Sequence, residues 1–309
     1  MLREKRGMPN SSINPPDPAP ASPEKEAELR RALETSEQTH GPSHPDVALS
    51  LNLLSDFLHD AKRLEEAEPL MRRAVQILEN KSGEPLPNYA AALSNLAVLL
   101  HDMKQHEEAI PHIRRALALD EQTHGPSHPH LIARLNTLAQ LLQATTQLEE
   151  IEPLLRRSLE ITVQHYGPMH IRVALQLDSL VEFLRTTYRL AEAEPLMRRA
   201  LEIYQQSYGD SHPGLVIPYN NHALLLQDMG ELKKAEIPLL CGLFIALRYT
   251  RDKGQRHPHM KEVIERYMSL CVERYISSEE IALRLVFIAR EHGFDEELMH
   301  ELLDEIGGK

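Results

Sequence analysis

The chain has few of the residues that mark secreted, metal-binding or membrane proteins. Its 309 residues include two cysteines and no tryptophan, and aromatic residues make up 5% of them. Cys241 and Cys271 lie in apolar, helix-like stretches without paired spacing, so the sequence predicts neither a disulfide framework nor a thiolate metal site. The longest apolar run, residues 239–247, is about half of the roughly 20 residues that a membrane span needs. The N-terminus has no apolar signal core, so we expect a cytoplasmic protein that does not cross a membrane.

Charge and motif content exclude further classes of function. With 46 acidic and 34 basic residues the formal net charge is −12, which disfavours nucleic acid and anionic membranes as main partners. The sequence has no glycine-rich phosphate loop, no GxSxG elbow and no catalytic cysteine context. We therefore expect no enzymatic activity and no cofactor. An active site built from single residues of different repeats would leave no linear motif, so a repeat-borne hydrolase stays a distant alternative.

A 42-residue repeat dominates the sequence. Glycine recurs at this interval at Gly41, Gly83, Gly125, Gly167 and Gly209, and all of these except Gly83 stand in a recurring phrase, HGPSHP, HGPSHP, YGPMHI and YGDSHP. A second phrase keeps the same interval and reads EAEPLMRRA, EAIPHIRRA, EIEPLLRRS and EAEPLMRRA from residues 66, 108, 150 and 192. Two landmarks that share one period indicate a duplicated structural unit, as in a solenoid.

Apolar residues within one repeat are spaced as an amphipathic helix pair requires. In the first repeat we expect an A helix over residues 45–61 and a B helix over residues 65–81. Pro45 suits a first helical turn, and Gly83 suits a left-handed residue after a helix end. The prolines of the second phrase are expected to set the start of each B helix, where backbone N–H groups have no intrahelical acceptor; they are Pro69, Pro111, Pro153 and Pro195.

The two ends of the chain depart from the repeat. Residues 1–22 are proline-rich and are expected to form a disordered tail. A lone B-type helix then opens a solenoid over residues 23–275, with about five to six helix pairs, and residues 276–309 form C-terminal capping helices. Helices are expected over residues 257–275, 278–291 and 295–306.

These residues resemble the tetratricopeptide repeats, and among them the lengthened repeats of the kinesin light chain type. LSNLAVLL at 93–100, HEEAIPHIRRALAL and HGPSHP at 124–129 carry most of the likeness, which covers residues 23 to about 260. The resemblance implies an all-α fold, a right-handed α-solenoid of antiparallel helix pairs, in which small residues such as Ala67 and Ala74 pack between paired helices. Kinesin light chains carry a long heptad segment ahead of their repeats, whereas 22 proline-rich residues precede them here, so we favour a stand-alone adaptor over a motor subunit.

The resemblance also implies a groove, lined by the A helices, in which polar side chains hold an extended peptide. The candidate groove residues are polar positions of the A helices: Asn52, Asp56, Asn95, Arg134, Asn136, Gln140, Asp178, Glu182, Asn220 and Asn221. Such side chains could instead satisfy neighbouring polar groups. Pro218 is expected to distort the start of the fifth A helix, next to Asn220 and Asn221.

Two other recurring features have simpler explanations than a site. Five arginine pairs begin at residues 30, 72, 114, 156 and 198, and in four of them a glutamate stands four residues before the first arginine, which predicts a salt-bridged solvent face and not a nucleic-acid site. Most of the 17 histidines belong to the loop phrase, where a polar residue before proline suits a helix start, so no metal site is expected.

The sequence therefore predicts an adaptor or scaffold that binds an extended peptide or a helix of another protein. A regulatory subunit that sequesters or inhibits a partner enzyme through the same surface is the alternative. The identity and charge of the partner, and the oligomeric state, stay open.

Overall fold

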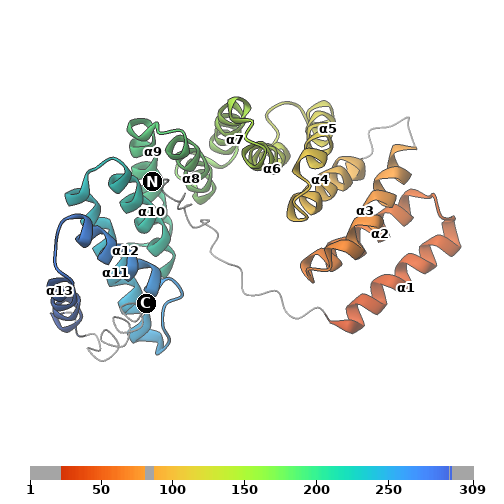
Figure 1. The fold of residues 1–309 in the computed structure, drawn as a ribbon. Coiled ribbons are helices and arrows are strands. Elements are labelled where there is room, and N and C mark those ends of the chain that lie inside the picture. The colour runs from red at the N-terminus through yellow and green to blue at the C-terminus, as the bar shows by residue number, and fades with distance from the viewer. Residues whose placement is uncertain (1–21, 81–86, 292, 294–309) are drawn as a thin grey trace. The chain divides into compact units, whose positions relative to one another are not determined.

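The computed structural model describes residues 22–80, 87–291 and 293. The described residues form two compact units, an N-terminal unit that ends at His165 and a C-terminal unit that begins at Tyr166. Each is built of α-helices that follow one another along the chain (Figure 1). The expected all-α repeat fold is confirmed. The predicted tail at residues 1–21, Gly83 and the helix predicted at 295–306 lie outside the described residues.

In the N-terminal unit, A and B helices alternate after a lone B helix. The B helices are α1 (Pro23–His40), α3 (Leu64–Glu79), α5 (His106–His124) and α7 (Ile151–Tyr166), and the A helices are α2 (Pro45–Asp60), α4 (Pro87–Asp102) and α6 (His130–Ala144). A 3₁₀ turn at Leu148–Glu150 leads into α7. The first repeat thus has the two predicted helices within a few residues of their expected bounds.

The C-terminal unit continues the alternation. Its A helices are α8 (Ile171–Thr186), α10 (Val216–Asp228) and α12 (Met260–Glu273), and its B helices are α9 (Leu190–Tyr208), α11 (Leu232–Lys253) and α13 (Ser278–Glu291). Helices were predicted over the ranges now occupied by α12 and α13. A 3₁₀ turn at Pro213–Leu215 precedes α10. Pro218 is the third residue of this helix, a position at which a backbone N–H would have no intrahelical acceptor, so the missing N–H of proline costs no hydrogen bond there.

Small residues let the paired helices approach. Ala67, Ala74, Ala109 and Ala116 have no exposed surface, and neither do their counterparts Ala193, Ala200 and Ala235. Leucines of the A helices, such as Leu51, Leu93 and Leu135, are at most 1% exposed and fill the space between helices. Because each helix buries one side against its neighbours, no single helix pair shields its own apolar surface.

Histidines cap the A helices and glycines end the B helices. The Nδ1 atoms of His44, His128 and His170 accept hydrogen bonds from backbone N–H groups two residues later, at 3.2, 3.3 and 3.2 Å. This confirms that the histidine of the loop phrase is the polar residue that begins the helix. Gly41 and Gly125 follow B helices with φ near +90° and ψ of 158° and 164°, an extended conformation open essentially only to glycine.

The prediction that prolines set the start of the B helices holds for α7, where Pro153 is the third helical residue, and is wrong for α3, α5 and α9. α3 begins at Leu64 and α5 at His106, so that Pro69 and Pro111 are each the sixth helical residue, and Pro195 has the same place in α9. The first turn forms without proline, since the N–H of Ala67 donates to the carbonyl of Arg63 at 3.2 Å. Each proline leaves a carbonyl four residues earlier without its helical donor. That residue, Glu65 in α3, is exposed, so water can replace the missing donor.

Candidate functional site

Three of the predicted groove residues form one polar cluster in the N-terminal unit. The side-chain amide of Asn95 on α4 donates to Asn52 Oδ1 at 3.1 Å and to the Asp56 carboxylate at 3.2 Å, and Asn52 also donates to Asp56 at 3.0 Å. Burial raises the pKa of the Asp56 carboxyl, and the nearby charge of Asp60 raises it further. The cluster joins α2 to α4 and remains half-buried.

The next A helix, α6, presents its candidates differently. Gln140 is exposed, whereas Asn136, one turn earlier, is half-buried, and its Oδ1 atom is shielded from solvent without a hydrogen-bond partner. Arg134 turns towards the preceding B helix, where its Nε lies 3.0 Å from Asp120 Oδ2, and both side chains are largely buried. A buried pair of this kind ties α6 to α5.

In the C-terminal unit the corresponding side chains are engaged or buried. Asp178 accepts a 2.6 Å hydrogen bond from the hydroxyl of Tyr204, whose pKa is raised by burial and by the Asp178 charge. Glu182 pairs with Arg185, which also reaches Asp228 on α10 at 2.9 Å.

Asn220 and Asn221 on α10 are 2% and 3% exposed, and Asn220 donates to Glu262 of α12 at 3.0 Å. The Oδ1 atoms of both asparagines are buried without a hydrogen-bond partner. The candidates Asn52, Asn95 and Asn136 in the N-terminal unit are therefore half-buried, as is Glu182 on α8, whereas Asp178, Asn220 and Asn221 are buried.

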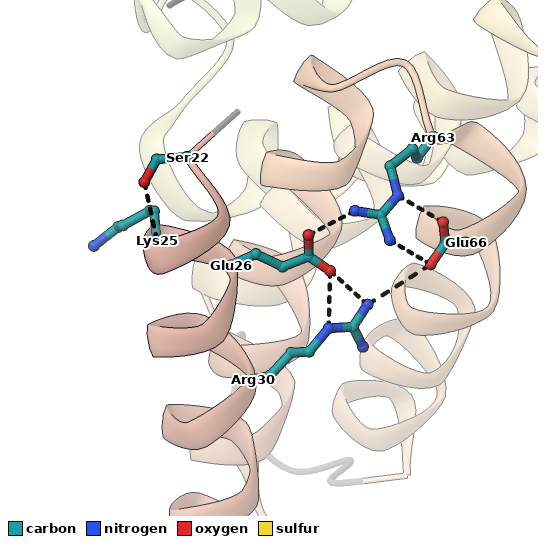
Figure 2. Close-up of polar contacts among 6 residues, drawn as sticks. All are labelled: Ser22, Lys25, Glu26, Arg30, Arg63 and Glu66. Carbon is teal, nitrogen blue, oxygen red and sulfur yellow. Dashed lines mark hydrogen bonds and ion pairs between the residues drawn. The ribbon is translucent and has the colours of Figure 1, made fainter. Parts of the chain in front are cut away.

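The arginine pairs form a salt-bridged face, as predicted. In all four predicted cases the first arginine binds the glutamate four residues before it: Arg30 with Glu26, Arg72 with Glu68, Arg156 with Glu152 and Arg198 with Glu194. Figure 2 shows the first case, where Arg63 adds a further pair with Glu26 and Glu66. Exposed pairs of this type each contribute about 0–1 kcal/mol, so they arrange the surface more than they stabilise it.

Ion pairs also connect successive B helices of the N-terminal unit, which the sequence reasoning missed. One series, here called the first rung, joins an arginine to the glutamate 36 residues later: Arg30–Glu66 at 3.7 Å, Arg72–Glu108 at 2.6 Å and Arg114–Glu150 at 2.9 Å. The second rung joins an arginine to the glutamate 36 residues earlier: Arg73–Glu37 at 2.6 Å, Arg115–Glu79 at 2.7 Å and Arg157–Glu121 at 2.5 Å. The constant spacing of 36 between opposite charges was the signal that could have revealed them.

Two clusters of the described residues bring three possible metal ligands together. Ring nitrogens of His124, His128 and His130 lie within 4.8 Å of one another, as do ligand atoms of His40, His44 and Asp46. However, Nδ1 of His128 accepts the helix-capping hydrogen bond, so the proton of the neutral ring is on Nε2 and neither nitrogen is open to a metal while the cap persists. The stack of His124 on His128 is repeated by Tyr166 on His170, which marks it as a packing feature of the loop.

No described helix is long and apolar enough to cross a membrane. The two cysteines are free thiols, and Cys271 is buried.

Comparison with known protein families decides the family. The model of the tetratricopeptide repeat matches residues 26–80, 88–162 and 173–243, well over half of the chain. The chain belongs to the tetratricopeptide repeat family. No curated protein sequence matches it.

Solved tetratricopeptide-type structures share the fold. BtubC (BKLC) from P. vanneervenii is 20% identical with a TM-score of 0.63, over 74% of this chain and 91% of that one. A putative kinesin light chain from Podosopora anserina with nearly identical TPR-like repeats is 22% identical with a TM-score of 0.62, over 67% and 99%. Aspartyl phosphate phosphatase F from Bacillus subtilis is 14% identical with a TM-score of 0.55, over 89% and 73%. At these identities the likeness concerns the fold alone.

Proposed function

We propose that this tetratricopeptide protein is a non-catalytic adaptor that binds an extended segment of another protein along the A helices of its N-terminal unit. The observation that carries the proposal is the partly open polar row on α2, α4 and α6. Asn52, Asn95 and Asn136 are half-buried, and Gln140 is exposed beside them. Amide side chains suit this task because each offers both a donor and an acceptor to a peptide backbone.

The buried, unpartnered Oδ1 of Asn136 supports the same surface. Buried polar atoms almost always have a hydrogen-bond partner, and one without a protein partner suggests a group supplied from outside. A backbone N–H of a bound segment would provide it after a small rotation of the Asn136 side chain. Asn220 and Asn221 on α10 also have an unpartnered Oδ1, but they are 2% and 3% exposed, which makes α10 a weaker candidate for this mode of binding.

The ionisable groups support a non-catalytic role. In the N-terminal unit the arginines and glutamates of the B helices form ion pairs in repeat register, as in Arg72–Glu108, which is the arrangement of a structural surface. The free thiols of Cys241 and Cys271 are consistent with a reducing compartment, and we propose a cytoplasmic location.

A photo-crosslinking experiment tests the proposal. A benzophenone amino acid replaces exposed Gln140 on the A helix α6, and in a matched control it replaces exposed Glu160 on the B helix α7. We expect a protein captured at position 140 and not at position 160. The purified partner should then bind Asn136→Ala with about tenfold lower affinity, because an unmet polar contact costs about 1–3 kcal/mol. Capture at position 160 alone, or equal affinity for the variant, would contradict the proposal.

A further inference from the structure

The two rungs that connect successive B helices are both missing between α9 and α11. At the first rung Arg198 keeps its own glutamate, Glu194, but the residue 36 positions later is Lys234, which has the same charge as the arginine. At the second rung the arginine is replaced by Cys241 and the glutamate 36 positions earlier by Gln205. Neither position can form an ion pair between the two helices.

A cavity of about 800 Å³ lies where these rungs would be. Its walls come from α9 and α11, and its floor is made by Tyr219, His222 and Leu226 of α10. Leu201 on α9 and Pro238 on α11 add apolar surface. Ile237, 66% exposed, adds a branched apolar side chain at the position where Pro195 stands one repeat earlier.

The polar groups around the cavity favour an anionic ligand. Arg198, Arg199 and Lys234 line it against two carboxylates, Glu194 and Glu202. Glu194 is paired with Arg198, and Lys234 is paired with Glu231 of its own helix end at 2.9 Å, so a ligand carboxylate would compete with Glu231 for Lys234. In the N-terminal unit the matching arginine, Arg72, binds both its own Glu68 and Glu108 of the next helix. Arg198 therefore lacks the second carboxylate that its counterpart has.

The floor of the cavity also contains an unsatisfied polar atom. Nε2 of His222 is shielded from solvent and has no hydrogen-bond partner. At the other end, the side-chain amide of Gln205, which stands where the second rung has its glutamate, donates a hydrogen bond to the hydroxyl of Tyr219 at 2.9 Å. A ligand that enters between α9 and α11 therefore meets polar groups on an otherwise apolar floor.

We propose that the groove between α9 and α11 is a second protein-binding site, which takes a peptide segment with an aliphatic or aromatic side chain next to a glutamate or aspartate. The apolar side chain fills the cavity over Leu201 and Leu226. The carboxylate lies between Arg198 and Lys234 and takes the place of the missing glutamate of the first rung. This site is formed by α9, α10 and α11 and shares no residue with the candidate row on α2, α4 and α6 of the proposed adaptor function.

Restoring the rungs in the full-length chain tests this site. An array of decapeptides, each with one leucine, isoleucine or phenylalanine flanked by glutamate, glutamine or lysine, is probed with the parent chain. The best glutamate peptide is then titrated by fluorescence anisotropy. We expect the parent chain to select the glutamate peptides. Lys234→Glu should lower the affinity for the best peptide at least about tenfold, because the new glutamate completes the first rung and repels the peptide carboxylate.

Two matched variants separate the groove from net charge. Lys233→Glu makes the same charge change on an exposed neighbour and should alter the affinity by less than about twofold. Gln205→Glu combined with Cys241→Arg rebuilds the second rung without changing net charge, and should weaken binding as Lys234→Glu does. Circular dichroism confirms that each variant keeps its helix content.

Several results would overturn the proposal. The first is equal affinity for glutamate and glutamine peptides. The second is an equal loss of affinity in Lys233→Glu and Lys234→Glu. The third is a loss of affinity for the same peptide in Asn136→Ala, which would place the peptide on the A-helix row. Concentration-dependent dimerisation that Lys234→Glu abolishes would show that a second copy of the chain occupies the groove instead.

Discussion

The turns between A and B helices contain a strained residue whose removal should stabilise the protein. Lys62, Lys104, Thr146 and Tyr188 have φ between 60° and 65°, and Gly230 occupies the same position in the next repeat with φ of 75°. A left-handed conformation costs an L-residue roughly 1–2 kcal/mol, and the cost is greatest for a β-branched side chain such as that of Thr146. Glycine avoids this strain but loses about 0.5–1 kcal/mol through the greater entropy of its unfolded chain.

Thr146→Gly should therefore increase the free energy of unfolding by about 0.5–1 kcal/mol. Equilibrium unfolding in urea should show a higher midpoint with an unchanged slope, since the surface exposed on unfolding is the same. The matched reverse change, Gly230→Thr, should lower the free energy of unfolding by about 0.5–1 kcal/mol and so lower the urea midpoint. A lower midpoint for Thr146→Gly, or no loss for Gly230→Thr, would refute the assignment of strain to this turn.

Three further predictions concern packing, a helix end and pH. Ala109→Arg should lower the free energy of unfolding by about 3 kcal/mol or more, because a long charged side chain enters a helix contact in which Ala109 has no exposed surface. An unchanged melting curve would show that Ala109 does not lie in a close helix contact. Gly125→Ala should cost about 1–3 kcal/mol from backbone strain alone, since an added Cβ meets nothing within 4 Å, whereas Gly242→Ala, where the Cβ makes ordinary contacts at 3.6 Å, should be neutral or stabilising. Burial, helped by the charge of His259, lowers the pKa of His257 to about 4. The contribution of neutral His257 to the free energy of unfolding is therefore fully present above the unfolded pKa near 6.5, and the free energy of unfolding falls by up to about 3 kcal/mol as the pH falls to 4. Urea midpoints at pH 7 and 4.5 should differ less in His257→Gln than in the parent chain, and an equal difference would exclude His257 as the cause.

The repeat and its helix pairs could be predicted because they depend on local spacing. The 42-residue interval, the helices starting at Pro23 and Pro45 and the capping histidines follow from periodicity and capping chemistry, which act within a few residues of one another. The intrahelical pair of Arg72 with Glu68 is local in the same sense, and the structure confirms it.

The errors arose where neighbouring backbone decides the outcome. Pro69 was expected at a helix start because proline lacks a donor, but the turn at Lys62 and Arg63 already nucleates α3, and an exposed carbonyl tolerates the proline further along. No conformation was predicted for the glycine that follows α5. At Gly125 the chain must leave α5 in an extended direction to reach His128, so ψ is 164°.

The groove residues could be proposed from their register, but their exposure could not. Asn52 and Asn220 occupy equivalent positions of the A helices, yet Asn52 is half-buried and Asn220 is 2% exposed and bonded to Glu262. The difference in exposure depends on the side chains that the following A helix packs against each asparagine. Residue spacing within one repeat contains no information about those side chains. The cavity between α9 and α11 was missed for the same reason, because its lining combines residues of three helices, α9, α10 and α11.

Hydrogen exchange on the complex with the partner captured at position 140 tests the central claim most directly. The bound partner should slow the exchange of backbone amide hydrogens in α2, α4 and α6. It should leave amide exchange in the B helices α3 and α5 unchanged. Protection confined to α3 and α5, with exchange in α4 and α6 the same as in the free chain, would contradict the account.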